Sequence, residues 1–229
     1  MTRNADTVWR IKVGDEEMSA IFEPASQTPS GALFVCAHGA GGHMNDAGML
    51  AVTDALRRRG LHIVRFNFPY RERKSNRPDP MPRLKECFAA VASHACEVVK
   101  PDILVLGGRS MGGRAASMLA ADGYPCDGLL LLAYPLHPAG QPEKLRDAHL
   151  ERIKVPVLCL NGTRDALCRR ELMERTVSRL SGKWTMHWLD GADHSFHVLK
   201  SSRRSYSDVL AEVADACGAW TSHLVRNGG

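Results

Sequence analysis

Three residues that together could cleave an acyl bond occur along this chain in the order Ser110, Asp165 and His194. A serine hydroxyl is a weak nucleophile, so it needs a base within hydrogen-bond reach and an acid that orients the base. Ser110 stands at the centre of a Gly-Arg-Ser-Met-Gly sequence. The flanking glycines permit a tight, strained turn that would expose the hydroxyl. The pattern predicts acyl transfer with Ser110 as nucleophile, His194 as base and Asp165 as acid.

Two other aspartates compete with Asp165 for the acid role. Asp190 and Asp193 lie within four residues of His194. So short a separation makes a side-on bond between a carboxylate and the imidazole harder to form. Asp165 follows an apolar run elsewhere in the chain, in an Asn-Gly-Thr-Arg-Asp turn. We therefore expect Asp165 to be the acid.

Two backbone N–H groups are needed to stabilise the oxyanion of a tetrahedral intermediate. The amide of Met111, directly after the serine, is the first expected donor. The second should come from the His-Gly-Ala-Gly-Gly sequence at 38–42, with Ala40 as the favoured donor and Gly39 and Gly41 as alternatives. This glycine-rich loop lacks the lysine of a P-loop and does not match a dinucleotide fingerprint, so a nucleotide site is not expected.

Arg109 and the basic segment 71–77 suggest an anionic substrate, because a guanidinium pairs well with carboxylate or phosphate. The alternative is that the segment is solvated and Arg109 is held by a structural partner. The residues expected to bind substrate are Gly39, Gly41, Tyr70, Arg109 and His137.

The candidate residues follow apolar runs that alternate with segments of helical spacing. Strands are expected over 32–37, 61–68, 103–106, 128–133, 155–160 and 184–189, and helices over 46–59, 83–99, 114–121, 169–180 and 205–224, with an antiparallel hairpin over 8–13 and 18–22. This alternation predicts an α/β fold with a doubly wound, mostly parallel sheet and helices on both faces. Ligands bind at the carboxyl ends of strands in such sheets, which is where the candidate residues fall.

Composition limits the alternatives. The 229 residues fit one α/β domain spanning 1–229, with 44% apolar and 24% charged residues. A net charge of +5 is spread along the chain and does not favour nucleic-acid binding. The seven cysteines form no Cys-x-x-Cys motif, and neither a signal peptide nor a membrane-spanning stretch is visible, so we expect a reduced, cytoplasmic setting. His194 and His197 are closely spaced, but no His-Glu-x-x-His motif occurs, so no metal or cofactor is expected.

Taken together, the Gly-x-Ser-x-Gly, His-Gly, Asp and late His motifs resemble a small serine α/β-hydrolase along essentially the whole chain. The phrases Phe-Asn-Phe-Pro-Tyr at 66–70, Gly-Gly-Arg-Ser-Met-Gly-Gly-Arg at 107–114, Tyr-Pro-Leu-His-Pro at 134–138 and Asp-His-Ser-Phe at 193–196 are similar to a compact subfamily of predicted hydrolases. That subfamily is related to the dienelactone hydrolases and to a subunit of the non-specific-lethal complex. Dienelactone hydrolases carry cysteine at the elbow, so their substrate does not transfer to a chain with Ser110.

The resemblance implies an esterase without a substantial lid, since residues 134–156 are too few for a multi-helix cap. An open site argues for a small or exposed acyl ester as the partner molecule. A non-catalytic scaffold that retains the fold is the main alternative, and a peptidase is less favoured. A homodimer is an open alternative to a monomer.

Overall fold

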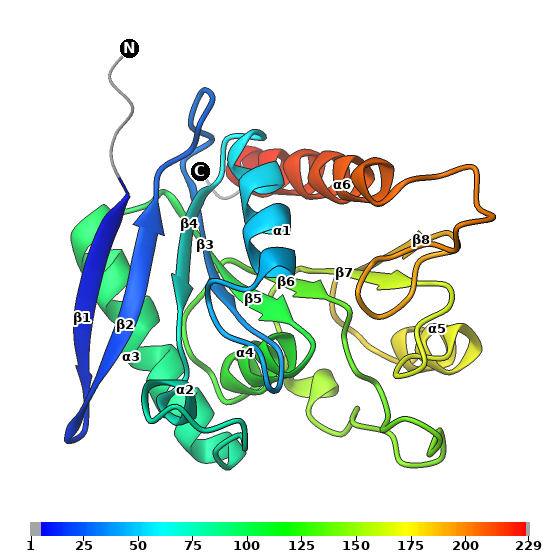
Figure 1. Ribbon diagram of the computed structural model, residues 1–229, viewed down its shortest axis with the longest axis horizontal. Helices are drawn as coiled ribbons and strands as arrows, with labels where there is room; N and C mark the ends of the chain where they lie inside the picture. Colours follow the sequence, from blue (N-terminus) through cyan, green and yellow to red (C-terminus); the bar gives the residue numbers. More distant parts are fainter. Residues whose placement is uncertain (1–5, 228–229) are drawn as a thin grey trace.

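The computed structural model describes residues 6–227, and within them a single eight-stranded sheet runs through the molecule (Figure 1). The strand order is β1-β2-β4-β3-β5-β6-β7-β8. The strands are β1 (Thr7–Val13), β2 (Glu16–Glu23), β3 (Ala32–Ala37), β4 (His62–Phe66), β5 (Ile103–Arg109), β6 (Gly128–Leu132), β7 (Val157–Gly162) and β8 (Trp184–Leu189). Strands β1 and β2 form the expected antiparallel hairpin at one edge, and β2 also pairs antiparallel with β4. The remaining neighbours are parallel, which confirms the predicted doubly wound sheet.

Helices cover both faces of the sheet (Figure 1). They are α1 (Ala47–Arg57), α2 (Pro69–Glu72), α3 (Met81–Val99), α4 (Met111–Ala121), α5 (Arg170–Val177) and α6 (Tyr206–Asn227), with a 3-10 turn at Leu150–Arg152. Buried side chains of α1 and α6 form one apolar core with one face of the sheet, and those of α3, α4 and α5 form a second core with the other face. The central strands β3 and β6 are buried along their whole length because helices cover both of their sides.

Several element boundaries differ from the sequence expectation by a few residues, and three local differences lie near the candidate site. Strand β5 continues to Arg109 and α4 begins at Met111, since Gly112 and Gly113 are accommodated in the first turn of the helix. A short helix, α2, lies within the expected loop at 69–82. Asp46 precedes α1 as expected but does not cap it with its side chain; the carboxylate accepts the His43 N–H instead, at 2.8 Å.

Residues 133–156, between β6 and β7, contain only the short 3-10 turn. No helical cap therefore covers the carboxyl edge of the sheet at this point, which confirms the expectation that a substantial lid is missing.

The cysteines are all free: Cys96 and Cys126 are half-buried and the other five are buried, in keeping with a packing role.

Candidate active site

Ser110 lies in the sharp turn between β5 and α4. Its backbone has φ 49° and ψ −114°, a conformation that side-chain-bearing residues seldom adopt. Its N–H donates to the Leu132 carbonyl at 2.9 Å, which ties the turn to β6. A Cβ atom at Gly108 would lie 2.1 Å from the Ala37 carbonyl oxygen, so the spacing of glycines around the serine reflects direct contact with β3.

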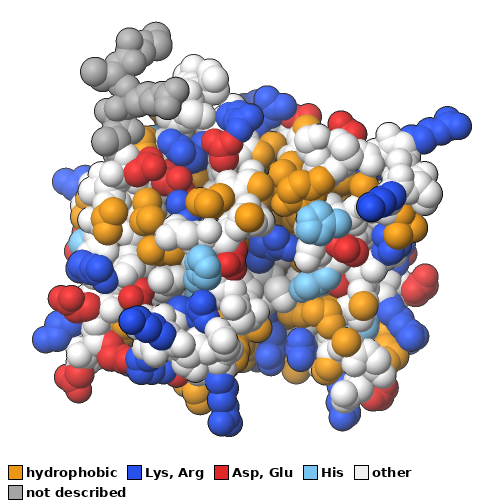
Figure 2. Space-filling model, viewed as in Figure 1, with side chains coloured by type: hydrophobic (Ala, Val, Ile, Leu, Met, Phe, Trp, Pro, Cys, Tyr) orange, Lys and Arg blue, Asp and Glu red, His pale blue; other side chains and the backbone are white. Residues whose placement is uncertain are grey.

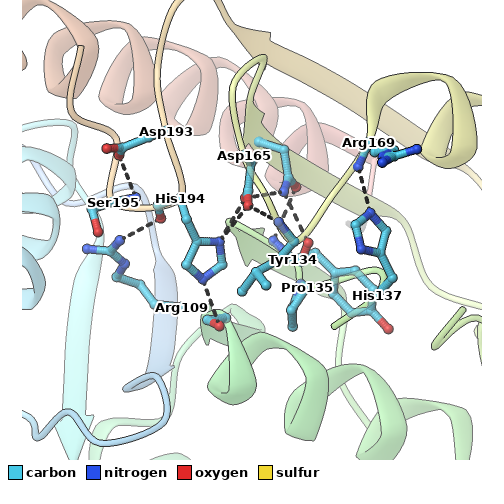
Figure 3. Close-up of polar contacts among 12 residues, drawn as sticks. Arg109, Tyr134, Pro135, His137, Asp165, Arg169, Asp193, His194 and Ser195 are labelled. Carbon is cyan, nitrogen blue, oxygen red and sulfur yellow. Dashed lines mark hydrogen bonds and ion pairs between the residues drawn. The ribbon is translucent and has the colours of Figure 1, made fainter. Parts of the chain in front are cut away.

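A continuous chain of hydrogen bonds joins the three residues that the sequence singled out. His194 Nε2 lies 3.0 Å from Ser110 Oγ. His194 Nδ1 lies 2.9 Å from Asp165 Oδ1 and 2.8 Å from Oδ2 (Figure 3). The acceptor-only carboxylate requires the ring proton on Nδ1, which leaves Nε2 free to accept the serine proton. Three loops, after β5, β7 and β8, contribute one residue each.

Asp165 is held by a buried amide that the sequence analysis missed. Its side chain has no exposed surface. Asn161 Nδ2 donates to Asp165 Oδ2 at 3.1 Å, and the Leu167 N–H donates to Oδ1 at 2.8 Å. Asn161 also accepts the Tyr134 N–H and donates to the Tyr134 carbonyl, at 3.2 and 3.1 Å, which joins the ends of β6 and β7. The sequence signal that could have identified Asn161 is a polar residue near the end of an otherwise apolar strand.

The loop after β8 presents His194. The two competing aspartates, Asp190 and Asp193, form hydrogen bonds with other groups. Asp193 Oδ1 accepts the N–H groups of Ser195 and His197 at 2.8 and 3.0 Å, as a turn residue does (Figure 3). Asp190 accepts the Thr163 hydroxyl at 3.5 Å. The imidazole ring of His194 contacts Asp165 and does not contact Asp190 or Asp193.

His38 fixes the start of the glycine-rich loop, a role the sequence analysis did not assign to it. The residue is fully buried, its Nε2 accepts the Phe68 N–H at 3.2 Å, and its Nδ1–H donates to the Gly39 carbonyl at 2.8 Å. Burial lowers the pKa of His38 to about 4, so the ring is neutral near pH 7.

The far end of the same loop is anchored from β4. The buried Arg65 donates to Glu23 Oε2 at 2.6 Å, to Asn45 Oδ1 at 3.0 Å and to the Met44 carbonyl. Asn67 Oδ1 accepts the Met44 N–H at 2.9 Å. With both of its ends tied to buried polar groups, the loop is built in advance of any ligand.

An open cavity of about 730 Å³ adjoins Ser110 and His194. Its walls are formed by Gly39, Ala40, Gly42, Asp46, Ala47, Gly48, Met49, Ala51, Arg109, Ser110, Leu167, His194, Ser195, His197 and Tyr206. Gly39, Ala40 and Arg109, which the sequence analysis named as oxyanion or substrate residues, are among those that line the cavity. Met111 is the first residue of α4, so its N–H is one of those that lack a partner within the helix. Gly41 (φ 71°) shapes the loop and is not among the lining residues.

Two residues expected to contact substrate are instead buried supports. Tyr70 is fully buried, and its hydroxyl lies 3.4 Å from the Gly39 carbonyl, beneath the loop. His137 is also buried. Its Nδ1–H donates to the Pro138 carbonyl at 2.9 Å, and its Nε2 accepts the Arg169 N–H at 3.1 Å (Figure 3). Both expectations were wrong for one reason: polar rings near a site also satisfy the backbone of buried loops.

Two of the four basic residues in the segment 71–77 make contacts within the protein. Arg73 pairs with Glu16 and Asp79, and Arg71 donates to the Ser75 carbonyl at 3.0 Å. Over the described residues, no group of three or more His, Cys, Asp or Glu is arranged to hold a metal ion. No helix within 6–227 is both long and apolar enough to cross a membrane.

The fold and the site define an α/β-hydrolase arrangement, and comparison with known proteins agrees. Residues 30–222 match the family described as the alpha/beta hydrolase domain, and the chain belongs to that family. Among solved structures, it is similar to an α/β serine hydrolase homologue from Coxiella burnetii, with 22% identity, a TM-score of 0.73 and coverage of 99% of this chain and 98% of that one.

Two other solved structures share the fold over nearly their full length. A serine hydrolase without a lid from Xanthomonas campestris has 20% identity, a TM-score of 0.75 and coverage of 96% of this chain and 97% of that one. A dienelactone hydrolase from Anabaena variabilis has 17% identity, a TM-score of 0.74 and coverage of 97% and 99%. At these identities the likeness establishes the fold, and the reaction has to be argued from the site.

Proposed function

We propose that this protein is a serine hydrolase that cleaves a small or exposed carboxylic ester through an acyl-enzyme. The observation that carries the proposal is the hydrogen-bonded chain from Ser110 through His194 to Asp165, with Ser110 Oγ at 3.0 Å from the base. The strained backbone of Ser110 supports it, because strain of this kind is retained where function requires it.

In the first half of the reaction, Ser110 Oγ attacks the acyl carbon while His194 Nε2 takes the hydroxyl proton. Asp165 keeps the opposite ring nitrogen protonated and stabilises the imidazolium that forms. The tetrahedral oxyanion is expected to accept from the N–H groups of Met111 and Ala40. When the intermediate collapses, the bond from carbon to the alcohol oxygen breaks and His194 returns its proton to the leaving alcohol.

In the second half, water replaces the alcohol. His194 Nε2 removes a proton from the water as the water oxygen attacks the acyl carbon. The bond to Ser110 Oγ then breaks, the serine regains a proton from His194, and the carboxylic acid departs. The buried Asp165 and its partner Asn161 serve both halves, because the imidazole is the proton carrier in each.

The open cavity and the uncovered edge of the sheet favour a small or exposed acyl group over a long lipid chain. Residues 133–156 provide no cap that could open at an interface, so interfacial activation of the lipase type is not expected. The carboxylesterase class is thus the best-supported activity.

The nucleophile can be tested with a fluorophosphonate probe and a panel of p-nitrophenyl esters of graded acyl length. The parent protein should be labelled and should hydrolyse the shorter esters. Ser110→Ala should lose labelling and at least about a thousandfold in kcat/KM. Ser201→Ala, which changes an exposed serine, is the matched control and should behave as the parent. Equal labelling of Ser110→Ala and the parent would rule out Ser110 as the nucleophile.

The same experiment separates the enzyme from the scaffold alternative. A folded parent protein that neither reacts with the probe nor hydrolyses any ester would favour a binding module of the kind suggested by the resemblance to the non-specific-lethal subunit. The hydrogen-bonded triad and the anchored glycine-rich loop support the enzyme, since a scaffold has no need of either.

A further inference from the structure

Arg109 lies beside the base and faces the cavity. It is the last residue of β5, directly before Ser110, and its side chain lines the same cavity as Ser110 and His194. Figure 3 shows it on the side of the His194 ring that is opposite Asp165. In Figure 2, basic and histidine side chains gather near the middle of the face that is viewed.

Among the described residues, no carboxylate contacts Arg109 directly, although Asp193 and Asp46 act on its charge from a distance. Within residues 6–227, no carboxylate forms an ion pair with it. Its hydrogen bond is from Nη2 to the His194 carbonyl, at 3.0 Å, and its guanidinium carbon lies 5.3 Å from the centre of the Phe196 ring. Burial lowers the pKa of Arg109, the mark of a cation removed from water.

The one carboxylate that lines the cavity is already engaged. Asp46 Oδ2 accepts the His43 N–H at 2.8 Å, and Oδ1 lies 3.0 Å from His43 Nε2. A guanidinium has five N–H donors, so a single bond to a carbonyl leaves donor capacity unused. Burying a cation without a directly bonded counter-ion is costly, and the cost is reduced when an anion binds.

We propose that Arg109 binds an acid group of the substrate, so that the preferred ester carries a carboxylate in addition to its acyl bond. This inference rests on the proposed hydrolase function. Gly48, at the start of α1, lets the guanidinium pack against the helix backbone, because a Cβ atom there would come within 2.7 Å of Arg109 Nη1. A carboxylate that enters from the cavity would bond N–H groups of Arg109 that the His194 carbonyl does not use. The planar fork of arginine suits such an acid group.

A purely structural role for Arg109 predicts a different outcome. If the side chain only held the His194 loop, its loss would slow the hydrolysis of every ester by the same factor. If it recognises an acid group, its loss should affect acidic esters selectively. The discriminating quantity is the ratio of kcat/KM for two esters that differ in the acid group alone.

The test pair is the monomethyl ester of succinic acid and methyl butyrate, which have acyl groups of equal chain length and whose hydrolysis can be followed by the acid released. We expect the parent to hydrolyse the succinate ester with the higher kcat/KM. Arg109→Gln should lose about ten- to hundredfold of this preference, which corresponds to the free energy of one charge-assisted hydrogen bond. Gln retains an N–H donor for the His194 carbonyl. Arg109→Lys keeps the charge and should retain part of the preference. Arg77→Gln removes an exposed charge outside the cavity and should match the parent.

A binding measurement keeps the inference separate from turnover. Titration of Ser110→Ala with succinate, and in parallel with inorganic phosphate, should show binding that the additional Arg109→Gln change abolishes. Stronger binding of phosphate than of succinate would overturn the assignment of a carboxylate. If no ester is hydrolysed but succinate binds through Arg109, the hydrolase proposal fails and the acid site stands. Equal losses for both esters in Arg109→Gln, or no succinate binding, would overturn the acid site.

Discussion

Acidification should destabilise this protein in a defined pH window because His38 is buried as a neutral ring. Burial lowers the pKa of His38 from 6.5 to about 4. Between these two values the unfolded chain binds a proton that the folded protein does not, so stability falls as pH falls. The contribution of His38 is complete above pH 6.5 and is lost as the pH approaches 4. At about 1.4 kcal/mol per pKa unit, the loss is about 3 kcal/mol.

The assay is urea unfolding of the parent and of His38→Asn at pH 7.5, 6.5, 5.5 and 4.5. His38→Asn should be less stable at pH 7.5, since it loses hydrogen bonds to Phe68 and Gly39. Its stability should then decline less between pH 6.5 and 4.5 than that of the parent. His149, whose pKa burial also lowers to about 4, accounts for a second part of the decline. His149→Gln supplies the matched comparison, and the double variant should have the flattest profile.

The comparison also has a result that refutes the reasoning. If His38→Asn declines with pH as steeply as the parent, His38 is not held neutral by the fold. The glycine-rich loop would then lack the anchor that we assign to it.

Two further changes test how the triad is supported. Asn161→Ala removes the donor to Asp165 Oδ2 and leaves buried backbone groups without partners. We therefore expect the free energy of unfolding to fall by about 1–3 kcal/mol, and kcat to fall about tenfold with little change in KM. Urea unfolding and steady-state kinetics would measure these effects, and an unchanged kcat would contradict the role of Asn161. Gly112→Ala would place a Cβ atom 2.4 Å from the Ala37 carbonyl oxygen and should destabilise the protein by about 1–3 kcal/mol or more. Gly123→Ala, at a positive φ with open space around it, measures backbone strain without a clash; a loss in Gly112→Ala below about 0.5 kcal/mol, measured by thermal unfolding, would argue against the clash.

Much of the fold follows from periodicity and composition. The apolar runs that end at Ala37 and Leu132 are buried strands because helices cover both faces, and such strands are uniformly apolar. The start of α4 was placed too late because glycine has low helix propensity in isolation. In the structure, close contact with β3 makes glycine necessary at 112, and tertiary packing outweighs propensity.

The residues that meet at the triad could be predicted because their strands end at one edge of a parallel sheet. The residues that hold the triad in place could not be predicted from the sequence. His38, Arg65 and Asn161 act through buried hydrogen bonds to backbone groups far away in the sequence. Local sequence does not show which buried carbonyl or amide needs a partner. The same limitation led us to expect Tyr70 and His137 in the cavity, where neither one lies.

The order of the strands has a consequence for the moment at which the protein first becomes reactive. Ser110 follows β5, whereas the base follows β8, the last strand in both the chain and the sheet. A growing polypeptide on the ribosome that has emerged only through α5 would carry the nucleophile without its base. On the proposed mechanism, such a chain is chemically silent. Labelling of Ser110 by an active-site probe would thus report that the sheet has closed to its final strand, a built-in marker of completed folding during synthesis.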